Sequence, residues 1–217
     1  MKTNELIDLL AAGESAVDRR ALGKRFALAL LGGGLGAILL MAALYGVRAD
    51  LADVARTPLF WAKVALPGSL ALIAYGLSSR LARPGVKGGA AWLLLGLPVL
   101  LVWLGGAVEL AAVPAEARAG LILGKTWRTC PLNIALLSIP TFIAVFWALR
   151  GLAPTRLRLA GAAGGLLAGA TSTLAYCLHC PEMGIPFWGV WYLLGMLLPT
   201  LLGLALGIVG RGALGAT

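Results

Sequence analysis

Residues 157–181 read LRLAGAAGGLLAGATSTLAYCLHCP, an apolar run that ends in two cysteines and a histidine. A helix needs about 20 mainly apolar residues to cross a bilayer, and the run from Leu157 to Cys177 is long enough. Its end, from Tyr176 to Pro181, holds two of the three cysteines in the chain and the only histidine. The stretch therefore predicts a membrane helix that leads directly into a cluster of reactive side chains.

The remainder of the chain is also strongly apolar. Apolar residues make up 60% of the sequence and charged residues 12%, whereas soluble domains carry about 25% charged residues. The runs long enough to span a membrane are 26–47, 59–79, 89–112, 131–150, 157–177 and 186–209. We therefore expect an all-α fold, a polytopic membrane bundle of six transmembrane helices in contact with membrane lipid.

The basic residues indicate an orientation. Twelve of the 18 lysines and arginines fall at the N-terminus, in the second and fourth loops, and at the C-terminus. Cytoplasmic segments carry this excess, so both termini are predicted to be cytoplasmic. The net charge of +9 is divided among short clusters between the apolar runs. It does not form the basic face of a nucleic-acid-binding protein, and no direct nucleic-acid partner is expected.

Residues 1–25 form the sizeable polar segment. Thr3 and Asn4 are helix-capping types, and acidic side chains follow in the first turn, where the helix dipole favours them. An apolar stripe comes next and Gly13 ends it. So short a helix is marginal alone in water. Its first turns lack the Lys/Arg-rich face of a lipid-binding helix, so we expect it to bind a partner protein through Glu5, Leu6, Ile7, Asp8, Leu9 and Leu10.

The three cysteines are predicted to lie together on the outer side. Cys130 precedes a proline that suits the first turn of a helix, and a thiol there has a lowered pKa, which Arg128 would lower further. Cys177 and Cys180 form a C-x-x-C pair, a pattern shared by redox, zinc and haem sites. Cys130, Cys180 and His179 could hold a transient heavy-metal ion, and no resident cofactor is expected.

Other residues within the apolar runs have simpler interpretations. Lys63 and Glu109 lie near the outer ends of consecutive spans, where they are expected to reach the interface or to pair with each other. Glycines recur at small-xxx-small spacing in the first span, in Gly32-Gly33-Gly34 with Gly36, and in the fifth, at Gly161, Gly165 and Gly169. This spacing predicts close helix–helix contacts.

The sequence resembles the NrsF family through three features taken together. These are the N-terminal MKTNELIDLLA, the six runs, and the motifs Thr129-Cys130-Pro131 and Cys177-Leu178-His179-Cys180-Pro181. The resemblance implies an inner-membrane anti-sigma factor that restrains an extracytoplasmic-function sigma factor and releases it under heavy-metal or oxidative stress. It also implies that Cys130 and Cys180 are the sensing thiols, with Cys177 as an addition.

Together, these features predict a non-enzymatic, multi-pass protein of the bacterial inner membrane with two parts. Residues 1–25 would hold the sigma factor in the cytoplasm, and residues 26–217 would form a six-helix sensor whose outer cysteines respond to the stress. Two other classes use outer thiols. A membrane thiol-disulfide oxidoreductase would normally need two cysteine pairs, and a metal-ion transporter would need thiols along a path across the bilayer.

Overall fold

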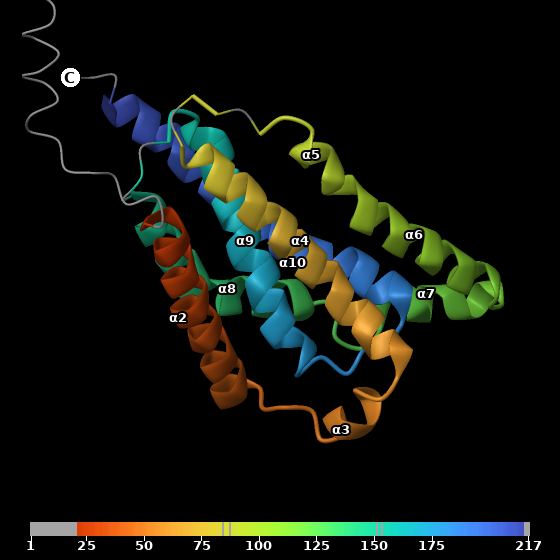
Figure 1. Cartoon of the computed structure of the whole chain (residues 1–217). Coiled ribbons are helices and arrows are strands. Elements are labelled where there is room, and N and C mark those ends of the chain that lie inside the picture. Colours follow the sequence, from red (N-terminus) through yellow and green to blue (C-terminus); the bar gives the residue numbers. More distant parts are fainter. Residues whose placement is uncertain (1–20, 84, 87, 151, 153, 215–217) are drawn as a thin grey trace, which may run out of the picture.

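The computed structural model of the protein describes residues 21–83, 85–86, 88–150, 152 and 154–214, with side chains described up to residue 207. This part of the chain is helical and contains no strand, which confirms the predicted all-α class (Figure 1). The helices are α2 (Ala21–Leu44), α3 (Leu51–Val54), α4 (Pro58–Leu81), α5 (Ala91–Leu94), α6 (Gly96–Ala111), α7 (Ala115–Leu123), α8 (Cys130–Arg150), α9 (Leu157–Cys177) and α10 (Ile185–Leu214).

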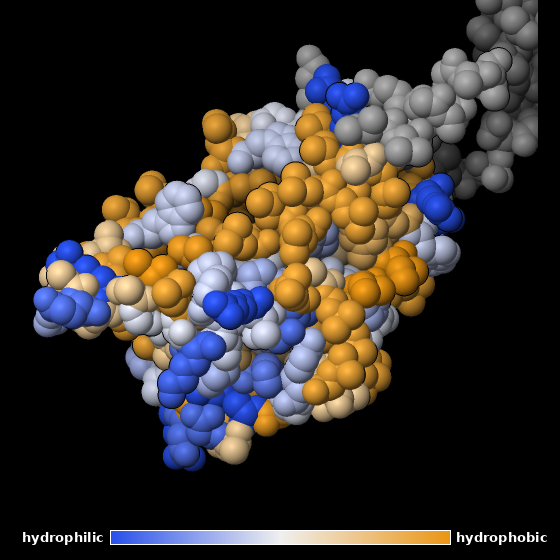
Figure 2. Space-filling view, turned by 180° about the vertical axis from the view of Figure 1, so that it is seen from behind, coloured by the Kyte–Doolittle hydropathy of each residue, from blue (hydrophilic) through white to orange (hydrophobic). Residues whose placement is uncertain are grey.

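Five segments of the described chain are long and apolar enough to cross a membrane. They are Ala21–Leu44, Pro58–Leu81, Ala91–Ala111, Cys130–Arg150 and Ile185–Gly207. Figure 2 shows the matching surface, an apolar band over the helices with hydrophilic residues gathered toward the two ends. The protein is a membrane protein, and five of the six predicted spans are confirmed in their length and composition.

The remaining predicted span, 157–177, forms α9 with the predicted bounds, but it is less apolar than the other five. Its glycine, alanine, serine and threonine content is high, and 15 of its 21 residues are buried within the protein. It packs against α10, α4, α8 and α2, and Figure 1 shows it among these helices. A helix covered by its neighbours needs small side chains more than apolar ones, because its surface faces protein instead of lipid.

Glycines bring α9 and α10 into backbone contact. A Cβ atom at Gly161 would collide with the carbonyl oxygen of Gly203, and one at Gly165 with the carbonyl oxygen of Pro199. In α2, a Cβ atom at Gly33 would collide with the backbone of Thr141 in α8. The predicted role of the small-residue spacings in close helix packing is therefore confirmed.

We expect Gly165→Leu to separate α9 from α10 and to destabilise the bundle. Overpacking a well-packed contact costs about 1–3 kcal/mol, and the obstacle here is backbone that cannot rotate away. Thermal unfolding in detergent should show a clear fall in the midpoint. Gly32→Leu is the matched control, because Gly32 is exposed and has no atom within 4 Å of an added Cβ. Equal midpoints for the two variants would contradict this packing argument.

The loops contain two short helices that the sequence did not predict, α3 and α7. The predicted third span is interrupted after α5, and α6 continues it. Thr57, in the short link between α3 and α4, caps α4, because its Oγ1 accepts from Phe60 N at 3.4 Å. Pro58 occupies the first helical position. These short elements bring the α2–α3 loop beneath the cysteine-bearing end of α9 (Figure 1).

Candidate thiol site

The three cysteines lie at one end of the bundle, as the sequence predicts. Cys130 is the first residue of α8, Cys177 the last of α9, and Cys180 lies in the loop that leads to α10. All three are free thiols with 0% exposure, and they belong to one packed cluster with Tyr176 and Tyr192. Thiols that are far apart in the sequence are thus brought together in the buried interior of the protein.

Local backbone structure sets the position of each thiol. The amide of Cys130 donates to the carbonyl of Thr126 at 2.9 Å, so the turn before α8 fixes the start of that helix. The amide of Cys180 donates to the carbonyl of Tyr176 at 3.0 Å, which curls the chain back beneath α9. This turn at the end of α9 places Cys180 next to Cys130 at the end of the bundle.

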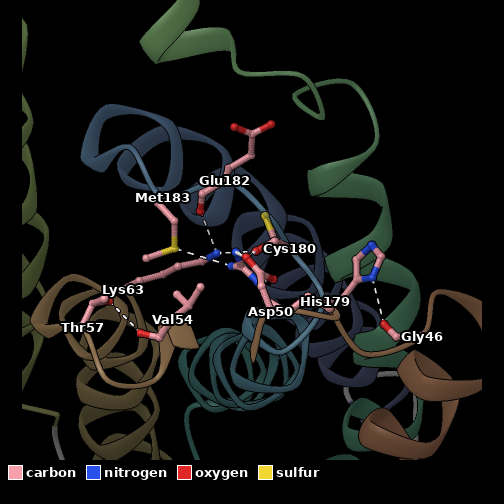
Figure 3. A network of polar contacts seen from close by, with 10 residues as sticks. Gly46, Asp50, Val54, Thr57, Lys63, His179, Cys180, Glu182 and Met183 are labelled. Atoms are coloured by element: carbon pink, nitrogen blue, oxygen red, sulfur yellow. Dashed lines mark hydrogen bonds and ion pairs between the residues drawn. The ribbon is translucent and has the colours of Figure 1, made fainter. Parts of the chain in front are cut away.

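Two cationic side chains converge on the carbonyl oxygen of Cys180 (Figure 3). Lys63 Nζ donates to it at 2.7 Å and Arg48 Nη1 at 3.1 Å. Lys63 Nζ also donates to the carbonyl of Glu182 at 2.8 Å. Arg48 is in turn held by an ion pair with Asp50, with 2.7 Å between Arg48 Nε and Asp50 Oδ1, and this pairing lowers the pKa of Asp50.

The pKa of the Cys180 thiol is lowered from its usual value. The largest cause is a hydrogen bond from the Cys130 thiol, and the charge of Lys63 acts in the same direction against the effect of burial. The sequence predicts a lowered pKa for the Cys130 thiol, with Arg128 as a contributor. Arg128 instead lies over the Trp127 ring, 5.0 Å from its centroid, so its charge is directed to an aromatic face.

Backbone and aromatic contacts orient His179, the histidine of the predicted metal-binding trio. Its Nδ1 lies 3.0 Å from the carbonyl oxygen of Gly46 and must donate there, because a carbonyl can only accept. Its ring packs between those of Tyr45 and Tyr176. In the part of the chain that the structure describes, no group of three or more His, Cys, Asp or Glu residues could hold a metal ion.

The chain just after α2 contacts the segments of both Cys130 and Cys180. Tyr45 donates to Asn133 Oδ1 at 3.0 Å, one turn after Cys130. The amide of Arg48 donates to the carbonyl of Leu178 at 3.1 Å, two residues before Cys180. The start of α2 lies at the opposite end of the bundle (Figure 1), so α2 connects the thiol site with the segment that precedes it.

The expected snorkelling or mutual pairing of Lys63 and Glu109 is wrong. Lys63 has 0% exposure and binds backbone carbonyls, while Glu109 Oε2 accepts from the amide of Ile185 at 2.9 Å, at the start of α10. Sequence reasoning missed the contribution of Lys63, Arg48 and Tyr192 to the thiol site. A lysine inside an apolar run was the available signal, because such charges are functional suspects.

The predicted sigma-binding residues, Glu5, Leu6, Ile7, Asp8, Leu9 and Leu10, lie outside the described residues. The whole chain can, however, be compared with known proteins. The profile of the NrsF family, described as negative regulator of sigma F, matches residues 10–209.

This chain belongs to the NrsF family. It is 50% identical over 207 residues to the probable anti-sigma-F factor NrsF of Azospira oryzae, covering 95% of this chain and 97% of the relative. It is 38% identical over 214 residues to the anti-sigma-F factor NrsF of Caulobacter vibrioides, covering 98% and 97%. No solved structure matches the chain. Membership of NrsF, a regulatory family, confirms the resemblance inferred from the N-terminal and cysteine motifs.

Proposed function

We propose that this protein is an inner-membrane anti-sigma factor whose thiol site controls release of its sigma factor. This proposal is supported above all by the position of Cys130 and Cys180, which lie together at the end of the bundle opposite the start of α2. Residues 1–25, which lead into α2, hold an extracytoplasmic-function sigma factor in the cytoplasm. The relatives named as anti-sigma-F factors support the sigma-factor partner.

The stimulus is oxidation of Cys130 and Cys180 to a disulfide. The two thiols lose two electrons and two protons, and a hydroperoxide or an oxidising heavy-metal species accepts the electrons. A disulfide requires Cα atoms about 4.4–6.8 Å apart, and the packing of Cys130 against Cys180 in one cluster favours this reaction. Metal capture by Cys130, Cys180 and His179 is the alternative stimulus. It is the less well supported of the two, since among the described residues no group of three such side chains is placed to hold an ion.

Helix α2 carries the signal across the membrane in this proposal. The disulfide draws the start of α8 and the loop of Cys180 together. Tyr45 contacts the first of these segments and Arg48 the second. Moving a sigma factor from mostly bound to mostly free takes about 5.5 kcal/mol of differential stability. Such a change crosses a packed bundle only as a switch between two discrete arrangements, which rigid displacement of α2 would provide.

The proposal requires the thiol site to face the periplasm and α9 to be a sixth span. We expect reporter fusions at residues 2 and 217 to report the cytoplasm and a fusion at residue 120 to report the periplasm, as the distribution of lysine and arginine indicates. The oxidising periplasm is also where disulfides persist. Periplasmic activity from either terminal fusion would rule out this orientation.

Membrane fractionation tests the function directly. When the protein is co-expressed with its sigma factor, the sigma factor should sediment with the membranes and move to the soluble fraction after hydrogen peroxide treatment. Transcription from a promoter of that sigma factor should rise in parallel. A sigma factor that stays soluble without stress would overturn the anti-sigma proposal, and one that stays bound after oxidation would overturn the release step.

A further inference from the structure

Lys63 is a buried cation at the centre of the thiol site. It lies in the first turns of α4 with 0% exposure, and Nζ donates to the carbonyls of Cys180 and Glu182 at 2.7 and 2.8 Å. The ring of Tyr192 lies beside it, with 5.6 Å between Nζ and the ring centroid. Carbonyls and an aromatic face orient an ammonium group, but they carry no negative charge to balance it.

No carboxylate of the described residues forms an ion pair with Lys63. Asp50 pairs with Arg48, and Glu109 accepts from the amide of Ile185. The carboxylate of Glu182 points away from Lys63 (Figure 3) and accepts from the amide of Lys125 at 2.7 Å. Buried charges are otherwise found paired, because removing an isolated charge from water is costly.

The group that can carry the balancing charge is the thiol of Cys180. The charge of Lys63 favours its thiolate, and so does the hydroxyl of Tyr192. That hydroxyl is buried and has no hydrogen-bond partner in the described chain. It acts on the Cys177 thiol as well as on Cys180, and a Cys180 thiolate would accept a hydrogen bond from it. The Cys130 thiol and the backbone amide of Glu182 also act on the Cys180 thiol as hydrogen-bond donors. The Cys177 thiol interacts with it electrostatically, and Arg48 donates to the carbonyl of Cys180.

We propose that Lys63 is the counter-ion of a Cys180 thiolate and the positioning residue that makes Cys180 the attacking sulfur. This inference rests on the proposed redox function of the same site. The Cys180 thiolate attacks a hydroperoxide, an S–O bond forms as the O–O bond breaks, and the departing oxygen takes up a proton. Cys130 then attacks the sulfenic acid, the S–S bond forms, and the hydroxyl group leaves as water.

Three substitutions at Lys63 separate charge from hydrogen bonding. In a Cys177→Ser background, Lys63→Met removes the charge and the donor, Lys63→Gln keeps a donor without the charge, and Lys63→Arg keeps both. The purified proteins are followed in detergent, without sigma factor, by thiolate absorbance near 240 nm and by the rate of disulfide formation with hydrogen peroxide across pH. Cys180→Ser in the same background supplies the baseline, and circular dichroism checks folding.

We expect Lys63→Met and Lys63→Gln to shift the onset of thiolate absorbance upward by a pH unit or more. At acidic pH, where the Cys180 thiol is mainly protonated in every variant, disulfide formation should then slow about tenfold, because a mainly protonated thiol loses tenfold in thiolate for each unit by which its pKa rises. Lys63→Arg should restore most of the rate. An unchanged pH profile in Lys63→Met, or full recovery in Lys63→Gln, would overturn the proposal in favour of a purely structural lysine.

Two further outcomes also test the role of Lys63. If no substitution at Lys63 gives a folded protein, the Cys177→Ser protein decides alone, and titration of Cys180 at or above the ordinary thiol value of about 8.5 overturns the proposal. If the disulfide forms as expected but the sigma factor stays bound in membranes, the proposed release function fails while the role of Lys63 stands.

Discussion

Replacing Leu6 and Leu10 together with aspartate should abolish sigma-factor binding. The apolar stripe of residues 6–10 is expected to bury in a groove of the partner, with Glu5 and Asp8 facing its basic residues. Each buried leucine contributes about 1.5–3 kcal/mol, so the pair should lower affinity by roughly two to four orders of magnitude. Co-purification from membranes and transcription from a sigma-dependent promoter measure the loss.

The matched control for this variant adds the same charge outside the stripe. Asn4→Asp combined with Ser15→Asp also introduces two carboxylates but removes no leucine, so binding should be largely retained. Both variants should insert into membranes normally, because residues 26–217 carry the spans. Retention of the sigma factor by the Leu6→Asp, Leu10→Asp protein would show that docking occurs elsewhere in the chain.

Serine in place of Cys130 or Cys180 should leave the sigma factor bound even under oxidative stress. Serine removes the sulfur needed for the disulfide while keeping a similar shape in the buried cluster. Peroxide-induced transcription should fall to the unstressed level in either single variant, and the double variant should be no worse, because both residues serve one bond. Mass spectrometry of the alkylated protein reports the disulfide itself.

Cys177→Ser supplies the internal control for the thiol experiment. Cys177 is as buried as the other two thiols, so any cost of placing serine in this interior is shared. Cys177→Ser should respond to peroxide nearly as the unaltered protein does, since the Cys130 thiol forms its hydrogen bond with Cys180. Normal responses from both Cys130→Ser and Cys180→Ser would remove the sensing role and leave these cysteines as packing residues.

The long helices of this protein were predictable because their signals are local. About 20 consecutive apolar residues are sufficient to indicate a span, and the predicted run 131–150 differs by one residue from the observed α8 (Cys130–Arg150). The spacing of Gly161, Gly165 and Gly169 likewise predicted a close contact with a neighbouring helix. Their partners in α10, Pro199 and Gly203, became known only when the two helices were seen together.

Of the thiol site, only the gathering of its three cysteines was predictable. Gathering of Cys130, Cys177 and Cys180 at one end follows from counting spans, since each cysteine lies at a span end on the same side. Which thiol is the more acidic does not follow, because electrostatic effects depend on neighbours brought in by folding. Arg128 is near Cys130 in sequence but lies over Trp127, whereas Lys63, 117 residues from Cys180, donates to its carbonyl.

The sequence by itself thus determined that the chain is an all-helical membrane protein of the NrsF family, with its cysteines at helix ends. Composition and motif spacing are properties of short segments, and they do not depend on what those segments pack against. Only the tertiary structure decided that α9 is enclosed by its neighbours and that Lys63 is buried against the loop of Cys180 instead of reaching the interface. Both depend on contacts between distant segments, since burial and charge pairing are properties of the assembled bundle.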